Sequence, residues 1–177
     1  MKTVLRLLVL LVVILAAAIG FIYSGLYDVS AGTPDRGLIR WALVNTQRHS
    51  VHRAVDAIKG KVKVPNLEDP QLIREGFVRY HRMCATCHGA PGVTISEIGQ
   101  GLNPDPPELS DIGRDEPEET FWVVKNGIKM TGMPAFGLTQ TDDEVWTIVA
   151  FARKMGKLTP QQYQAMEQQA GLAAAHP

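Results

Sequence analysis

The sequence predicts an all-α protein that begins with a membrane-spanning helix. Helix-start signals recur along the chain, apolar residues follow them at spacings of three and four, and no stretch alternates apolar and polar residues as a half-buried strand does. The 177 residues include 18 Lys+Arg and 18 Asp+Glu, and 45% are hydrophobic. This balance excludes a nucleic-acid binder, which needs a basic excess, and a disordered chain, which is poor in apolar residues.

The N-terminal segment has the length and composition of a membrane anchor. Residues 7–23 carry no charge, and the stretch extends to about 20 residues, which at about 1.5 Å per residue matches a bilayer core of roughly 30 Å. Lys2 and Arg6 precede it, and the next basic residue is Arg36, so the positive-inside rule places the N-terminus in the cytoplasm. A cleaved signal peptide is the alternative, because Ala16-Ala17-Ala18 resembles a cleavage site. The apolar stretch continues past these alanines, which favours an uncleaved anchor over residues 1–27.

Residues 28–68 are predicted to form a helical arm and a linker. Thr33-Pro34 reads as an N-cap with the first helical residue, and Gly60 reads as a stop. Apolar residues recur between them near a seven-residue spacing: Trp41, Val44, Val51, Val55 and Ile58. Arg48 interrupts this stripe, and a helix that cannot close a core alone must pack on the domain, on the membrane surface or on a partner.

Residues 69–158 are predicted to form the compact domain, and residues 159–177 a C-terminal helix and tail. Helix starts are expected at Asp69-Pro70, at Pro117, at the capping box that opens with Thr141, and at Thr159-Pro160. Long loops rich in glycine and proline separate them, over residues 89–115 and 127–139. Loops of this length in a domain of about 90 residues need something to wrap around.

The motif that carries the chemistry is Cys84-Ala85-Thr86-Cys87-His88. Two thiols at this spacing can each add to a vinyl group of a haem, and the adjacent His88 then supplies the proximal nitrogen to the iron. The alternatives are a thioredoxin-like redox pair, which needs a βαβ context that is missing, and half of a zinc site, which needs further ligands. The spacing of Cys84 and Cys87 also rules out a disulfide framework.

Together these features resemble the monohaem class I c-type cytochromes, in particular the haem domain of the cytochrome subunits of cbb3-type oxidases. The resemblance covers roughly residues 70–157. It rests on Gly76 and Tyr80 before the motif, on Cys-His-Gly at residues 87–89, on the stretch NGIKMTGMPAF at residues 126–136, and on Trp146. It implies a class I cytochrome c fold, in which the first and last helices of the domain cross near Gly76 around one covalent haem c.

The second axial ligand is expected from the loop that contains Met133. Gly132 permits unusual backbone angles there, and Pro134 stiffens the exit. In the family this methionine position is the sixth ligand, so the resemblance implies that His88 and Met133 bind the iron. A thioether stabilises ferrous iron and leaves no open coordination site. Met130 is the nearest rival, and its alternative role is packing beside the ring.

Other residues carry weaker signals. Pro106, Pro107 and Leu109 look like the family's apolar segment at the haem edge, although as bare sequence they are only a turn. We expect Phe121, Trp122 and Trp146 to pack in the core or on the porphyrin, and His49 and His52 to be solvated. Eight Asp+Glu against one Arg over residues 97–119 form either a solvated face or a surface that steers a basic partner.

The sequence therefore predicts a membrane-anchored monohaem cytochrome c that transfers single electrons and is not an enzyme. We expect it in the bacterial inner membrane as a single-pass protein with its haem domain in the periplasm. Its partner would be a membrane redox complex or an exported oxidoreductase. Two alternatives stay open: a haem enzyme or gas sensor with an open sixth site, and a structural haem subunit of a larger respiratory or dehydrogenase complex.

Overall fold

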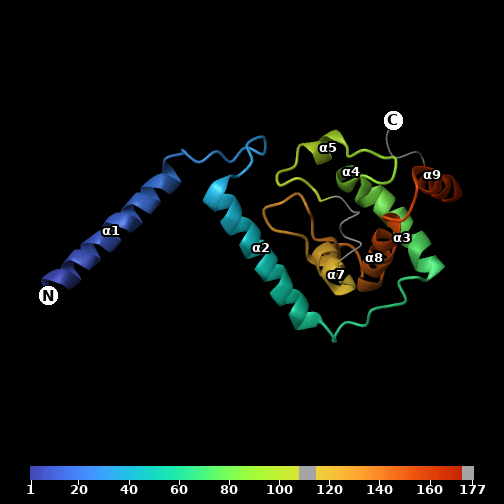
Figure 1. Cartoon of the computed structure of the whole chain (residues 1–177), viewed down its shortest axis with the longest axis horizontal. Coiled ribbons are helices and arrows are strands. Elements are labelled where there is room, and N and C mark those ends of the chain that lie inside the picture. The colour runs from blue at the N-terminus through green and yellow to red at the C-terminus, as the bar shows by residue number, and fades with distance from the viewer. Residues whose placement is uncertain (108–114, 173–177) are drawn as a thin grey trace. The chain divides into compact units, whose positions relative to one another are not determined.

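The computed structural model describes residues 1–107 and 115–172, and within these ranges it contains helices and no strand. A single antiparallel bridge joins Ala90 and Val93. The all-α prediction is confirmed. The chain divides into two compact units, Met1–Thr33 and Pro34–Pro177, which are described separately below. Figure 1 shows the order of the elements along the chain.

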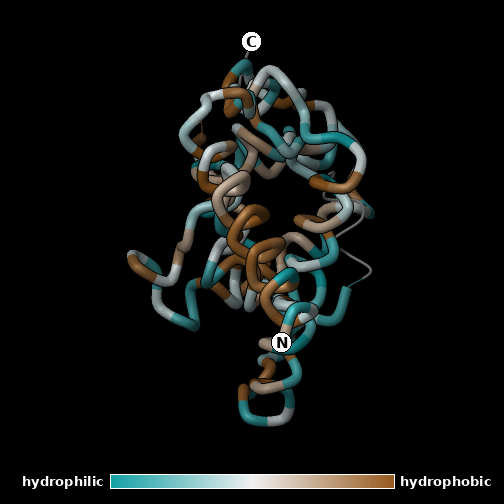
Figure 2. The backbone as a smooth tube through the Cα atoms, turned by 90° about the vertical axis from the view of Figure 1, so that its left-hand side faces the viewer, coloured by the Kyte–Doolittle hydropathy of each residue, from teal (hydrophilic) through white to brown (hydrophobic). Residues whose placement is uncertain are grey.

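The first unit is dominated by α1, Lys2–Tyr23, which begins five residues before the uncharged stretch and runs to its end. None of its residues is buried. Among the described residues α1 alone is long and apolar enough to cross a membrane, and a signal sequence near an N-terminus has the same properties. Figure 2 shows hydrophobic residues concentrated along it.

The second unit is organised around the crossing of α3, Pro70–Met83, with α8, Asp142–Met155. Both helices start where the sequence predicts, because the Asp69 side chain accepts the Gln71 amide at 2.8 Å and Thr141 forms a capping box with Glu144. At Gly76 the two backbones touch: a Cβ there would overlap the carbonyl oxygen of Thr147. The expected crossing near Gly76 is confirmed.

The core lies on both sides of this crossing. α8 is buried on nearly all sides, beyond the single face that the sequence pattern indicates. α7, Pro117–Asn126, adds Phe121, whose ring stacks on Trp146 with centroids 4.3 Å apart. α9, Pro160–Gln169, adds Tyr163, which lies edge-on to Phe77 at 5.2 Å and is fully buried. Both helices start where the sequence predicts: Pro117 is the first residue of α7, and Thr159 opens α9 with a capping box.

The predicted arm is α2, Gly37–Ile58, and it starts later than expected. Thr33-Pro34 does not open it, because Gly37 has φ +57° and a right-handed helix cannot continue back through that conformation. The second half of α2 lies beside α7 (Figure 1), and the two buried residues of α2, Val51 and Val55, belong to this half. Ile58, at the end of the predicted stripe, is half-buried against the core, whereas Trp41 is 63% exposed and Val44 40%.

Candidate functional site

The cysteine motif forms a single helical turn, α4, Ala85–His88, directly after α3. The carbonyl of Cys84 accepts the amide of Cys87 at 3.0 Å and that of His88 at 2.9 Å. Residues three and four apart share one side of a helical turn, so Cys84 is neighboured on the turn by Cys87 and by His88. The arrangement suits a flat group that is bound by both sulfurs and by the ring.

The turn is held by neighbours on two sides. The buried Tyr80 hydroxyl donates to the carbonyl of Gly89 at 2.5 Å, and burial raises the pKa of Tyr80, so it remains a donor. On another side lies α5, Glu97–Gln100, where the Ser96 hydroxyl donates to the Thr86 carbonyl at 2.8 Å. A Cβ on Gly99 would lie 3.0 Å from the Cα of Cys87, so any side chain there would have to push the two backbones apart by a few tenths of an ångström. These contacts fix the motif's backbone.

The orientation of His88 is set by a backbone carbonyl. Its Nδ1 lies 3.0 Å from the carbonyl oxygen of Pro107. A carbonyl can only accept, so in this bond Nδ1 carries the hydrogen and Nε2 is left with its lone pair. Ligating histidines typically make this second contact, which fixes both the tautomer and the ring. Sequence reasoning had linked Pro107 to the haem edge, but gave no signal that its carbonyl would orient His88.

Met133 lies in the loop after α7, which is held by hydrogen bonds between its own residues. Gly127, at φ +65°, ends that helix, and its Cα packs against the backbone of Met133 and Pro134. The Ile128 amide donates to the Met133 carbonyl at 3.2 Å, and the Met133 amide donates to the Thr131 hydroxyl at 3.1 Å. The side chain of Met133 is half-buried and packs against the cluster of core residues that includes Cys84.

Met130 and Gly132 behave differently from the sequence-based expectation for this loop. The unusual backbone angle is at Met130, with φ +61°, and not at Gly132, which is absent from the residues with positive φ. Gly132 serves a close approach, since a Cβ there would lie 2.6 Å from the side chain of Leu102. The Met130 side chain is 79% exposed, so it does not pack in the core.

The remaining predicted residues lie as follows. Phe121 and Trp146 are core residues and Trp122 is half-buried, whereas His49 and His52 are exposed on α2. The acidic segment is partly neutralised, because Glu116 pairs with Lys59 at the end of α2 at 2.5 Å. Leu109 lies outside the described ranges, as do the other residues of the acidic segment between 108 and 114.

The environment of the cysteines bears on the two alternative chemistries. Burial raises the pKa of the Cys84 thiol to about 12, and Cys87 adds to the effect, whereas a redox-active thiol has a lowered pKa. The strand-to-helix junction of a thioredoxin site is missing from the described residues. Within them no three His, Cys, Asp or Glu side chains are placed to hold a metal ion, as a closed zinc site requires.

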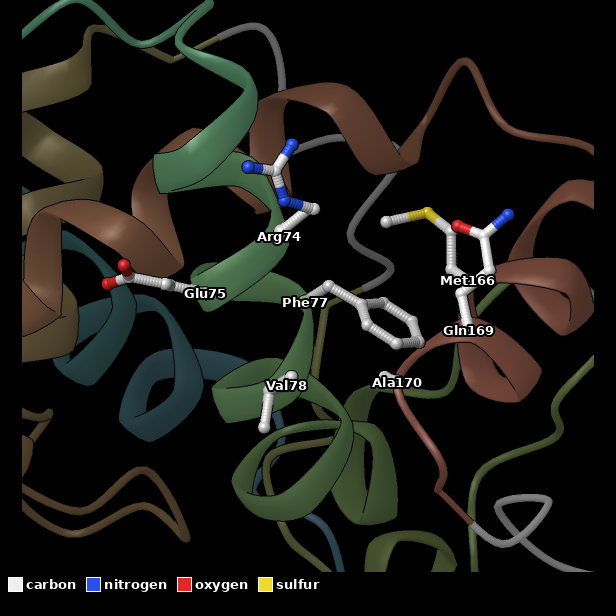
Figure 3. A pocket seen from close by; sticks show the side chains of 7 residues that line it. All are labelled: Arg74, Glu75, Phe77, Val78, Met166, Gln169 and Ala170. Carbon is white, nitrogen blue, oxygen red and sulfur yellow. The ribbon is translucent and has the colours of Figure 1, made fainter.

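A pocket of about 270 Å³ lies elsewhere, between α3 and α9. Figure 3 shows its lining, in which Arg74, Glu75, Phe77 and Val78 come from α3 and Met166, Gln169 and Ala170 from the end of α9. None of the four residues expected to hold the haem lines this pocket: Cys84, Cys87, His88 and Met133. It is therefore separate from the motif.

Comparison with known proteins identifies the domain. Residues 71–151 match the family described as "Cytochrome C oxidase, cbb3-type, subunit III". The chain is also similar to the "Alcohol dehydrogenase (quinone), dehydrogenase subunit" of Acetobacter aceti, with 27% identity over 154 residues. That alignment covers 78% of this chain, and the chain spans 19% of the length of that relative.

The donors in this domain fit the cofactor that the family implies. Cys84 and Cys87 offer two thiols for thioether bonds, and His88 has its Nδ1 hydrogen engaged, which leaves Nε2 for iron. The family match and the C-x-x-C-H spacing together imply a covalently bound haem c. Domains of this kind are typically electron carriers rather than enzymes. Residues 71–151 thus form a cytochrome c domain that belongs to the cbb3-type subunit III family.

Proposed function

We propose that this chain is a membrane-anchored monohaem cytochrome c that carries single electrons between redox partners on the periplasmic side of the bacterial inner membrane. Cys84 and Cys87 attach the haem, His88 and Met133 are its axial ligands, and no substrate is transformed. α1 stays uncleaved and holds the domain at the membrane. The length of α1, which continues past the alanines of the candidate cleavage site, supports anchoring.

The observation that carries the proposal is the hydrogen bond between His88 Nδ1 and the Pro107 carbonyl. It gives the imidazole of a C-x-x-C-H motif the tautomer that a proximal ligand needs. The bond therefore supports the assignment of His88 as the proximal ligand.

Met133 is proposed over Met130 because of its surroundings. The half-buried Met133 is held by hydrogen bonds at both its amide and its carbonyl, whereas Met130 is exposed at the loop tip. When bound, the haem iron alternates between the ferric and ferrous states and so carries one electron. The protein's part is to hold both ligands in both states. A thioether ligand favours the ferrous state, and a filled sixth position keeps small molecules off the iron.

Covalent attachment is tested on denatured protein. In the variant that combines Cys84→Ala with Cys87→Ala, we expect no haem signal on a denaturing gel stained for haem peroxidase activity, because thioether bonds alone survive denaturation. Thr86→Ser is the matched control, since it changes the motif at a position with no role in attachment, and it keeps the signal. A haem signal that persists in the double variant contradicts the assignment.

Potentiometric titration of the wild type is expected to follow a one-electron Nernst curve.

A second candidate function is that of a fixed haem subunit in a dehydrogenase complex. The similarity to a relative that is itself named as a dehydrogenase subunit favours it. Gentle detergent extraction of native membranes distinguishes the two. A stoichiometric complex that survives purification supports the subunit, and a free cytochrome that still exchanges electrons with a separate protein supports the carrier.

A further inference from the structure

The first half of α2 carries an apolar face that is exposed. We define the outer face as Leu38, Ile39, Trp41, Ala42 and Leu43, all of them exposed, with Leu38 at 76% and Trp41 at 63%. At about 100° per residue, the outer face is centred roughly 160° around the helix axis from Val51 and Val55, the two buried residues of α2. The outer face is therefore centred away from the contact of α2 with the domain, and Trp41 forms its edge nearest to Val55.

Arginines border the outer face on both sides. By the same helical periodicity Arg48 lies just beyond one edge, next to Trp41, and Arg40 lies about 60° beyond the other edge, at Leu43. Arg36 directly precedes the helix. No Asp or Glu occurs from residue 36 to residue 55. Apolar side chains in the centre, a tryptophan and flanking arginines are the pattern of a helix that lies in the boundary of a lipid surface. There the arginine stems cover apolar area while the guanidinium groups reach anionic headgroups.

The chain itself keeps a membrane within reach. Residues 24–36 join the end of α1 to the start of α2, and 13 residues span at most about 45 Å. We propose that the outer face of α2 binds the surface of the membrane in which α1 is anchored, through apolar contact and attraction of Arg36, Arg40 and Arg48 to anionic lipids. This proposal rests on the proposed anchoring by α1.

Such a contact would affect electron transfer through orientation. The second half of α2 packs on α7, and Lys59 just after it pairs with Glu116 just before α7. A first half held on lipid would therefore limit how the cytochrome c domain turns on its tether. A membrane partner would then meet a restricted set of orientations of the domain.

The test uses the full-length holoprotein, reduced so that its low-spin iron is diamagnetic, in nanodiscs of phosphatidylcholine with or without phosphatidylglycerol. A nitroxide label is placed at Ala42→Cys, in the centre of the outer face, or at the matched exposed position Gln47→Cys, on the opposite side of the same half. Attachment of the haem leaves the introduced thiol as the free one. Power saturation compares access of the label to oxygen and to a water-soluble nickel chelate.

We expect an oxygen-to-nickel access ratio several-fold higher at residue 42 than at residue 47, and higher again with phosphatidylglycerol. Replacing Arg36, Arg40 and Arg48 by glutamine should remove the effect of phosphatidylglycerol and leave the haem spectrum unchanged. Equal ratios at the two positions, in protein whose intact mass retains residues 1–33, overturn the lipid contact alone. Loss of residues 1–33 overturns the anchor and this proposal together. A label at residue 42 that is open to nickel in nanodiscs but shielded in native membranes assigns the outer face to a protein partner instead.

Discussion

The crossed helices α3 and α8 and the loop at residues 127–135 contribute to the same domain by different means. The helices are held by broad burial, with Phe77, Val145 and Phe151 at most 2% exposed. The loop is held by single hydrogen bonds, such as the 3.2 Å bond from the Ile128 amide to the Met133 carbonyl. On the proposed ligation by Met133, stability and iron binding would therefore depend on different residues. Substitutions in the helices should change stability, and substitutions in the loop should change the haem.

Gly76→Val is expected to have the largest effect on the helices. A side chain there meets the Thr147 backbone, which cannot move without separating α3 from α8, so we expect a loss of at least about 3 kcal/mol in the free energy of unfolding. Denaturant unfolding followed by far-ultraviolet circular dichroism measures it. Gly101→Ala is the matched control, because its Cβ would meet its nearest atom at an ordinary 3.5 Å. If both variants unfold at the same denaturant concentration, the crossing does not depend on Gly76.

Tyr80→Phe tests how α3 holds the loop that follows the cysteine motif, since the Tyr80 hydroxyl donates to the carbonyl of Gly89 at its start. The change leaves the carbonyl of Gly89 without its buried donor, and we expect a loss of about 1–3 kcal/mol in the free energy of unfolding. The near-infrared spectrum of the ferric protein should stay unchanged, because Met133 is not in this contact. Unchanged stability with an altered spectrum would mean that Tyr80 acts on the ligands and not on the fold.

Glu144→Gln has a smaller effect that depends on pH. The Thr141 amide, the Arg79 guanidinium and the Thr141 hydroxyl lower the pKa of Glu144 to about 2 from its ordinary 4.5. A lowered pKa in the folded state means that the ionised group stabilises the fold above pH 4.5, and that this contribution is lost as the pH falls from 4.5 towards 2. The variant should be less stable than the wild type at pH 7, with a gap that narrows below pH 4.5. Thermal unfolding across this range measures the gap, and a constant gap contradicts the assignment.

The helices of the domain could be predicted from the sequence because their signals are local. Asp69-Pro70, Pro117 and the Thr141 capping box each set a helix start through atoms within three residues. The predicted start of α2 was wrong because it relied on a local signal alone. Thr33-Pro34 is a good local signal, but Gly37 adopts a positive φ that no local pattern announces.

The site could be predicted only in part. The order Cys84-x-x-Cys87-His88 identifies the motif from spacing alone, whereas the acceptor for His88 is a backbone carbonyl 19 residues away. Every residue offers such a carbonyl, so sequence cannot single out that of Pro107. The role of Gly132 could not be predicted from the sequence either. Its backbone lies close to the side chain of Leu102, which is 30 residues earlier in the chain.

The central claim, that Met133 binds the iron opposite His88, is tested most directly by the near-infrared spectrum of the ferric protein. Ligation of iron by methionine sulfur gives a weak charge-transfer band there. We predict that the wild type and Met130→Ala show this band and that Met133→Ala lacks it. In the ferrous state carbon monoxide should bind Met133→Ala but not the wild type, because only the variant has an open position. A band that survives in Met133→Ala and disappears in Met130→Ala, or a wild type that binds carbon monoxide readily, would contradict the account.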